Sequence, residues 1–161
     1  MKIFITGVAG FLGSHLADLM ISEGHTVAGN DNMIGGYTDN VPQNVEFYQV
    51  DCCDLENMTK AMEGCDIVYH TAATAYEGLS VFSPVLVTRN IFEASVTTIT
   101  AAIRNKVKRI VYCSSMARYG HHDKMPYKET FECRPQDPYG IAKKAGEDVL
   151  KNLCETHGVE Y

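Results

Sequence analysis

The segment Lys2-Ile3-Phe4-Ile5-Thr6-Gly7-Val8-Ala9-Gly10-Phe11-Leu12-Gly13 decides the fold. Its first five residues form an apolar, β-branched run that predicts a buried strand. Three glycines follow at three-residue spacing, and the amphipathic stretch from Ser14 to Glu23 predicts a helix. A second apolar run starts at Thr26 and ends in Asp31. This order of strand, glycine-rich turn, helix and acid-tipped strand is typical of a dinucleotide-binding unit.

Each glycine has its own expected role in such a unit. Gly7 lets the chain turn sharply off the strand, Gly10 lets backbone N–H groups approach a pyrophosphate, and Gly13 lets the helix pack closely on the sheet. The phosphates then lie at the positive end of the helix. Asp31, twenty-four residues after Gly7, can accept hydrogen bonds from both ribose hydroxyls. The glycine spacing alone is a weak signal, and the flanking strands and the acid make it specific.

The bulk composition indicates one globular domain. The chain has 161 residues, of which 45% are hydrophobic and 21% are charged. The net charge of −6 argues against a nucleic-acid or membrane-surface partner. No apolar run approaches membrane-spanning length. The six cysteines contain no C-x-x-C pair, so we expect reduced thiols in a cytoplasmic protein. The neighbouring His121 and His122 lie in a polar stretch, and no metal site is expected there.

Strand and helix patterns alternate along the rest of the chain. Further strands are predicted at Val45–Val50, Asp66–Thr71 and Arg109–Ser114, and further helices at Leu55–Met62, Pro84–Asn105 and Tyr139–Thr156. The polar segment Tyr119–Asp137 predicts a loop. This alternation indicates an α/β fold with a Rossmann-type, doubly wound parallel sheet covered by helices on both faces. Residues 158–161 look like the start of a sixth strand, so we expect residues 1–161 to be the first portion of a longer protein.

A second group of polar residues follows the predicted fifth strand. Ser115 lies where that strand ends, on the same rim as the glycine loop, and Tyr139 and Lys143 lie one turn apart on the next helix. Taken singly, these residues fit a turn hydroxyl, a buried aromatic ring and a solvated cation. Together, beside a nucleotide site, they predict a catalytic trio. A free phenol has a pKa near 10, and an adjacent ammonium and a cationic nicotinamide both favour the phenolate.

With both groups in view, the chain resembles the extended short-chain dehydrogenase/reductase superfamily, in its nucleotide-sugar epimerase/dehydratase branch. The resemblance covers the whole chain and rests on Thr6–Leu16, Asp31-Asn32, Asp51-Cys52, His70–Ala73, Ser114–Gly120 and Pro138–Lys143. It implies a Rossmann domain that binds NAD, a nucleotide-sugar substrate, and a sugar-nucleotide domain that would follow residue 161. It also implies a homodimer of the full-length protein.

The resemblance further assigns roles to individual residues. Phe11 and Leu12 would help to cover the pyrophosphate, Asp31 and Asn32 would hold the ribose end, Asp51 and the backbone of Cys52 would hold adenine, and Ala72 and Ala73 would line the nicotinamide side. Ser115, Tyr139 and Lys143 would be catalytic, and the last two would also contact NAD. Two positions depart from the family pattern. Asn90 is one residue out of step with the small pair that follows it, and Arg118 stands where an apolar residue is expected.

Three hypotheses about function follow. The first is a 4-epimerase that inverts C4 of a UDP-hexose through a transient 4-keto sugar. The second is a nucleotide-sugar dehydratase, decarboxylase or other extended short-chain oxidoreductase. Dehydratases of this branch carry acids after the catalytic hydroxyl residue, where this chain has Met116 and Ala117. The third, from another class, is a non-catalytic dinucleotide-binding module. NAD is expected rather than NADP because Asp31 repels a 2′-phosphate and no Arg or Lys occurs between Asp31 and Thr59.

Overall fold

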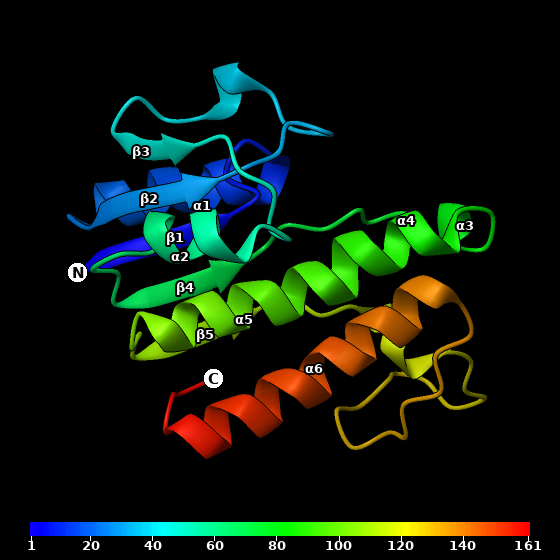
Figure 1. The fold of residues 1–161 in the computed structure, drawn as a ribbon. Coiled ribbons are helices and arrows are strands. Elements are labelled where there is room, and N and C mark those ends of the chain that lie inside the picture. The colour runs from blue at the N-terminus through cyan, green and yellow to red at the C-terminus, as the bar shows by residue number, and fades with distance from the viewer.

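The computed structural model describes residues 1–161 and has a five-stranded parallel sheet at its centre (Figure 1). The strands are β1 (Lys2–Thr6), β2 (Thr26–Asn30), β3 (Val45–Tyr48), β4 (Ile67–His70) and β5 (Arg109–Tyr112). Their order across the sheet is β3-β2-β1-β4-β5. The α-helices are α1 (Phe11–Ser22), α2 (Leu55–Ala61), α3 (Glu77–Ser80), α4 (Pro84–Thr88), α5 (Ala94–Arg104) and α6 (Pro138–His157). The predicted doubly wound fold is confirmed.

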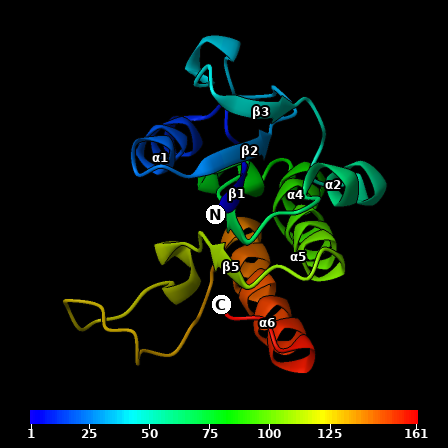
Figure 2. The ribbon, with the colours of Figure 1, turned by 90° about the vertical axis from the view of Figure 1, so that its left-hand side faces the viewer.

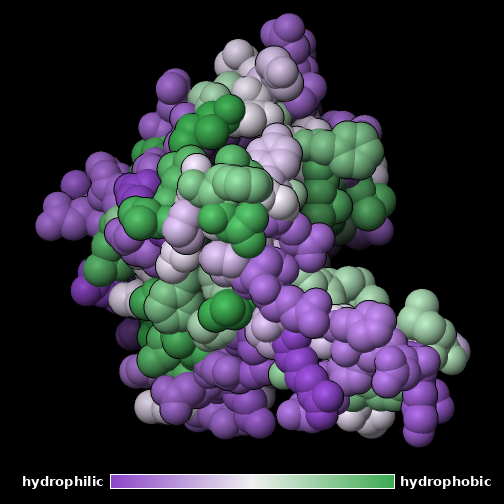
Figure 3. Space-filling view, turned by 90° about the vertical axis from the view of Figure 1, so that its right-hand side faces the viewer, coloured by the Kyte–Doolittle hydropathy of each residue, from purple (hydrophilic) through white to green (hydrophobic).

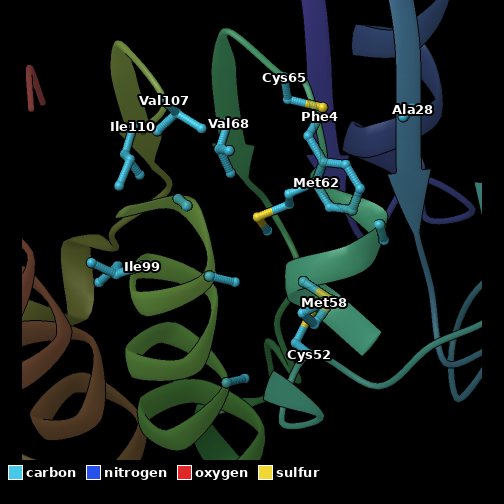
Figure 4. Packing of buried hydrophobic residues seen from close by; sticks show 14 of the residues in the cluster. Phe4, Ala28, Cys52, Met58, Met62, Cys65, Val68, Ile99, Val107 and Ile110 are labelled. Carbon is cyan, nitrogen blue, oxygen red and sulfur yellow. The ribbon is translucent and has the colours of Figure 1, made fainter. Parts of the chain in front are cut away.

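Helices cover both faces of the sheet. Figure 2 shows α1 on one side and α2, α5 and α6 on the other. Because successive residues of a strand point to opposite faces, β1 contributes to two cores. Ile3 and Ile5 pack with Ala17 and Met20 of α1. Phe4 points to the other side, where Figure 4 shows it beside Met62 of the segment after α2.

The order of the strands creates a crevice between β1 and β4. The chain runs from β1 outward to β2 and β3, and then returns to the other side of β1 to form β4 and β5. Connections that leave β1 and β4 therefore pass over opposite faces of the sheet. Ligands of open α/β sheets bind at this point, beyond the carboxyl ends of the strands.

Short-range signals fix the ends of α6. The Asp137 side chain accepts a hydrogen bond from the Gly140 N–H at 2.9 Å and so caps the first turn. Pro138 occupies the first helical position, where its missing N–H has no cost. Gly158 ends the helix in the left-handed conformation at φ 69°. The predicted helix is thus confirmed, extended by one residue at each end.

The long helix predicted at Pro84–Asn105 is confirmed in extent but is not regular. A π-helical turn, η2 (Arg89–Glu93), lies between α4 and α5. Two 3₁₀ turns, η1 (Thr38–Asn40) and η3 (Met116–Tyr119), and the short α3 are additional elements that no periodic pattern indicates.

The strand ends differ slightly from the prediction. β5 stops at Tyr112, so Cys113 and Ser114 lie beyond the strand rather than within it. Beside β5, in the position of the expected sixth strand, Glu160 forms a single parallel bridge with Arg109. None of the helices combines the length and the hydropathy that a bilayer span requires.

The turn from β1 into α1 requires glycine at two positions. Gly7 has φ +69°, a conformation that side chains disfavour. Gly13 has an ordinary φ, but a Cβ atom there would lie 2.1 Å from the Gly7 carbonyl oxygen. The start of α1 therefore lies in direct backbone contact with the loop that leaves β1.

We predict that Gly13→Ala destabilises the protein by about 1–3 kcal/mol, because the added methyl group forces the helix away from the loop. The matched control is Gly78→Ala in α3, where nothing lies within 4 Å of an added Cβ atom. That change should alter stability by less than about 0.5 kcal/mol. Urea unfolding of both variants is the measurement, and equal effects would contradict the close contact.

Candidate functional site

A pocket of about 390 Å³ lies beyond the carboxyl ends of β1, β2 and β4. Figure 3 views the molecule from the side toward which the strands point, and hydrophobic side chains gather on much of this face. The pocket lining includes all eleven residues outside the trio that the sequence predicts for the cofactor, namely Gly7, Gly10, Phe11, Leu12, Gly13, Asp31, Asn32, Asp51, Cys52, Ala72 and Ala73. Four separate loops thus bring these residues together. The volume of the pocket falls within the range that is usual for ligand sites.

Asp31 is held in one orientation at the end of β2. Its Oδ2 accepts a hydrogen bond from the Ala9 N–H at 3.2 Å, and its Oδ1 accepts one from the Met33 N–H at 2.8 Å. The residue is 8% exposed. Each carboxylate oxygen has a second lone pair, so the group can still accept hydrogen bonds from a ligand.

Asp51, at the next loop, is paired with a cation. The Cys53 N–H donates to its Oδ1 at 2.8 Å, and Arg89 of the π turn donates to its Oδ2 at 3.2 Å. Burial alone would raise the pKa of Asp51, but the Cys53 N–H and the Arg89 guanidinium outweigh burial and hold that pKa below its usual value. The carboxylate is therefore charged at neutral pH.

The π turn also places Asn90 in the pocket wall. The Asn90 Nδ2 donates to Thr74 Oγ1 at 3.0 Å, and Asn90 and Ala94 both line the pocket. Asn90 and Ala94 are four residues apart and lie on the same side of the helix, toward the pocket. The place of Asn90 in the pocket wall could not be predicted from the sequence, where the one signal of it is the out-of-step spacing to the small residues Ala94 and Ser95.

The predicted trio lies next to the pocket but does not line it. Tyr139 is 7% exposed and packs with Ile91, the residue after Asn90. The π turn therefore has the pocket on one side and Tyr139 on the other. The Tyr139 hydroxyl forms no hydrogen bond within the chain. Ser115 caps η3, and its Oγ accepts a hydrogen bond from the Ala117 N–H at 3.1 Å.

Lys143 is the most deeply buried cation of the chain, with 2% exposure. Its Nζ donates to the Cys113 carbonyl oxygen at 2.7 Å, just beyond β5. Burial lowers the pKa of Lys143 to about 8. The side chain thus remains mostly an ammonium at pH 7, one helical turn from Tyr139.

Arg118, which departs from the family pattern, has a structural partner. It forms an ion pair with Glu147 of α6 at 3.1 Å, and its Nε donates to Cys133 Sγ at 3.1 Å. Ser114 donates a short hydrogen bond to the same Glu147 carboxylate. The charge that the sequence leaves unexplained therefore ties the segment around Ser115 to the helix that carries Tyr139 and Lys143.

The chain holds no group of three or more His, Cys, Asp or Glu side chains arranged to bind a metal ion. His122 forms a hydrogen bond with the Glu132 carbonyl oxygen at 2.9 Å and packs against Tyr127 and Phe131. All six cysteines are unpaired.

The pocket suits a dinucleotide on structural grounds. The glycine loop leaves no room for Cβ atoms at Gly7 and Gly13, where a backbone approaches closely. The first turn of α1 offers N–H groups to phosphates without any nearby lysine. At the pocket wall, the buried Asn30 Oδ1 has no hydrogen-bond partner within the chain.

Known proteins share this arrangement. The chain is 34% identical over 164 residues to a probable UDP-arabinose 4-epimerase of Arabidopsis thaliana, a match that covers 95% of the chain and 40% of that relative. A UDP-glucose 4-epimerase of Thermotoga maritima, solved with UDP-glucose, superimposes with a TM-score of 0.95 and 32% identity over 99% of the chain and 53% of that protein. A UDP-glucose 4-epimerase of Brucella ovis, solved with NAD, superimposes with a TM-score of 0.95 and 30% identity. That match covers 99% of the chain and 50% of the Brucella protein.

The chain thus spans about half the length of the relatives that it matches. Residues 3–161 match the family described as the NAD dependent epimerase/dehydratase family, which includes every segment of the pocket and of the Ser115–Tyr139–Lys143 trio. The chain therefore belongs to the NAD dependent epimerase/dehydratase family.

Proposed function

We propose that this protein uses NAD to invert C4 of a UDP-sugar. The observation that carries the proposal is the pocket itself, in which the glycine loop, Asp31 and Asp51 meet beside the buried Tyr139 and Lys143. Relatives of about one-third identity are named UDP-glucose or UDP-arabinose 4-epimerases, and solved neighbours hold NAD or UDP-glucose. These names support a UDP-sugar as the substrate class.

In this proposal the pocket orients NAD along its length. Asp31 would bind the adenosine ribose hydroxyls, the N–H groups of the first turn of α1 would hold the pyrophosphate, and the loop with Ala72 and Ala73 would border the nicotinamide. Phe11 and Leu12 cover the pyrophosphate from the rim, where they are exposed. Asp51 and the backbone of Cys52 hold the adenine. The chemistry that bound NAD supplies is reversible acceptance of a hydride from C4.

The trio handles the proton of the C4 hydroxyl. Tyr139 accepts this proton as general base when the alcohol becomes a ketone, and returns it when the alcohol is restored on the opposite face. The Lys143 ammonium lies one helical turn along α6 and adds a positive charge on the same face. Ser115 donates its hydroxyl hydrogen to the same substrate oxygen, while its Oγ keeps the bond from the Ala117 N–H.

The first prediction concerns the choice of cofactor. NAD should bind at least about tenfold more tightly than NADP, because a 2′-phosphate would meet the oriented Asp31 carboxylate. Asp31→Asn removes this repulsion and should reduce the difference between the affinities for NAD and NADP. Calorimetric titration of both cofactors against both proteins is the measurement. Tighter binding of NADP to the wild type would contradict the placement of Asp31.

The second prediction concerns the general base. Tyr139→Phe should lower kcat at least about tenfold with little change in NAD affinity, because it keeps the ring packed on Ile91 and removes the proton acceptor. Lys143→Ala should lose both turnover and NAD affinity. Turnover is measured on the longest form of the protein that its gene encodes. If Tyr139→Phe retains most of the wild-type kcat, another group is the base.

The third prediction separates epimerisation from dehydration. Removal of water across C5 and C6 needs an acid to protonate the departing C6 hydroxyl. Met116 and Ala117 follow Ser115 and can donate no proton. Incubation with UDP-glucose, UDP-galactose and UDP-arabinose, followed by NMR of the products, should give inversion at C4 with no net reduction of NAD. Accumulation of a 4-keto-6-deoxy sugar would instead identify a dehydratase.

A further inference from the structure

A buried chain of hydrogen bonds crosses the sheet behind the pocket. His70, at the end of β4, is 1% exposed and lies between Thr6 of β1 and Ser95 of α5. Its Nδ1 is 2.8 Å from Thr6 Oγ1, and its Nε2 is 3.0 Å from Ser95 Oγ. The mechanism proposed above uses none of these three residues.

The hydrogen bonds around Thr6 settle where its hydroxyl hydrogen points. The Thr71 N–H and the Ala72 N–H donate to Thr6 Oγ1 at 3.1 and 3.0 Å. These two donors occupy both lone pairs of the hydroxyl oxygen. The Thr6 hydrogen must therefore be donated to the remaining neighbour, which is His70 Nδ1. An acceptor Nδ1 carries no hydrogen.

The bonds around Ser95 lead independently to the same conclusion. Ser95 Oγ lies 2.5 Å from the Ile91 carbonyl oxygen, and only a hydrogen donated by the serine permits two oxygens to approach so closely. Ser95 Oγ must then accept from His70 Nε2. The hydrogen bonds at Thr6 and those at Ser95 thus both require a neutral His70 imidazole with its hydrogen on Nε2. Burial, reinforced by the Lys143 charge, lowers the pKa of His70 to about 3, so the neutral form persists at neutral pH.

This series of hydrogen bonds ends at the pocket wall. The two N–H groups that Thr6 holds belong to residues that line the pocket, and a Cβ atom at Gly7 would lie 2.9 Å from the Ala72 Cα. The loop after β4 therefore lies against the end of β1. Both lone pairs of the Thr6 hydroxyl remain free for this backbone because His70 accepts its hydrogen.

We propose that His70, as the Nε2–H tautomer, is a positioning residue for NAD: it orients Thr6, and Thr6 fixes the backbone of Thr71 and Ala72 at the nicotinamide side of the pocket. The inference rests on the proposed function. The effect of His70 on binding is expected only at the nicotinamide end of NAD, because the adenine and pyrophosphate end of the pocket is built from other loops. Loss of the Thr6 hydroxyl should weaken NAD binding and spare ADP binding.

The tautomer can be observed directly in the wild-type protein. In ¹⁵N-histidine-labelled protein at pH 7, long-range ¹H–¹⁵N correlation should give His70 one protonated nitrogen, Nε2, and one unprotonated nitrogen, Nδ1, far downfield. The pattern should persist to pH 5. A hydrogen on Nδ1, or an imidazolium at pH 7, would overturn the proposal without reference to any ligand.

The binding test uses a matched pair of substitutions. Thr6→Val removes the hydroxyl that His70 orients, and Thr98→Val removes one from α5 that is equally buried but lies outside this series of hydrogen bonds. Thr6→Val should weaken NAD binding about tenfold and change ADP binding less than about twofold, while Thr98→Val changes neither. Equal NAD affinities of the two variants, or a parallel loss of ADP binding by Thr6→Val, would overturn the inference.

A gentler variant covers the case in which Thr6→Val fails to fold. Ser95→Ala leaves the His70 Nε2–H without its acceptor and should weaken NAD binding at least about threefold with ADP binding unchanged. Unchanged NAD affinity would contradict the proposal. A wild-type protein that binds neither NAD nor ADP would instead overturn the proposed function, and the tautomer would remain a separate test of the hydrogen-bond chain.

Discussion

The backbone contact between Gly13 and Gly7 is the constraint on which the rest of the structure depends. A Cβ atom at Gly13 would lie 2.1 Å from the Gly7 carbonyl oxygen, so α1 can begin where it does only because that position is glycine. The contact brings the first N–H groups of α1 to the end of β1. It also lets the Ala9 N–H reach Asp31, which aligns the carboxylate. The parts of the pocket at the start of α1 and at Asp31 follow from this one approach.

A negatively charged protein can bind a negatively charged ligand in this way. The net charge is −6, and the glycine loop carries no lysine or arginine. Oriented N–H groups and the end of the α1 dipole supply a local positive potential, which does not depend on the charge of the whole molecule. The buried Lys143 is placed apart from this loop, beyond β5, where its Nζ donates to the Cys113 carbonyl oxygen.

Much of the fold and the pocket could be predicted from sequence, because the signals were local. Apolar runs and glycine positions located β1, α1 and β2, and Gly158 marked the end of α6. The parts that were missed depend on tertiary contacts. The π turn at Arg89–Glu93 has an ordinary helical pattern, and its effect on Asn90 becomes visible only beside Thr74. The partner of Arg118 lies 29 residues away in the chain, at Glu147. The hydrogen bonds of His70 join three elements, β1, β4 and α5, that are distant in sequence.

We propose that the glycine loop, the acid after β2 and the loop after β4 bind one NAD molecule together. Titration of uniformly ¹⁵N-labelled protein with NAD, followed by backbone amide NMR, tests this binding mode most directly. We expect shifts in the amides of Gly10–Gly13, of Asp31-Asn32 and of Thr71–Ala73, with little change at residues 121–131. Saturable shifts confined to that latter loop, with the glycine-loop amides unmoved, would contradict it.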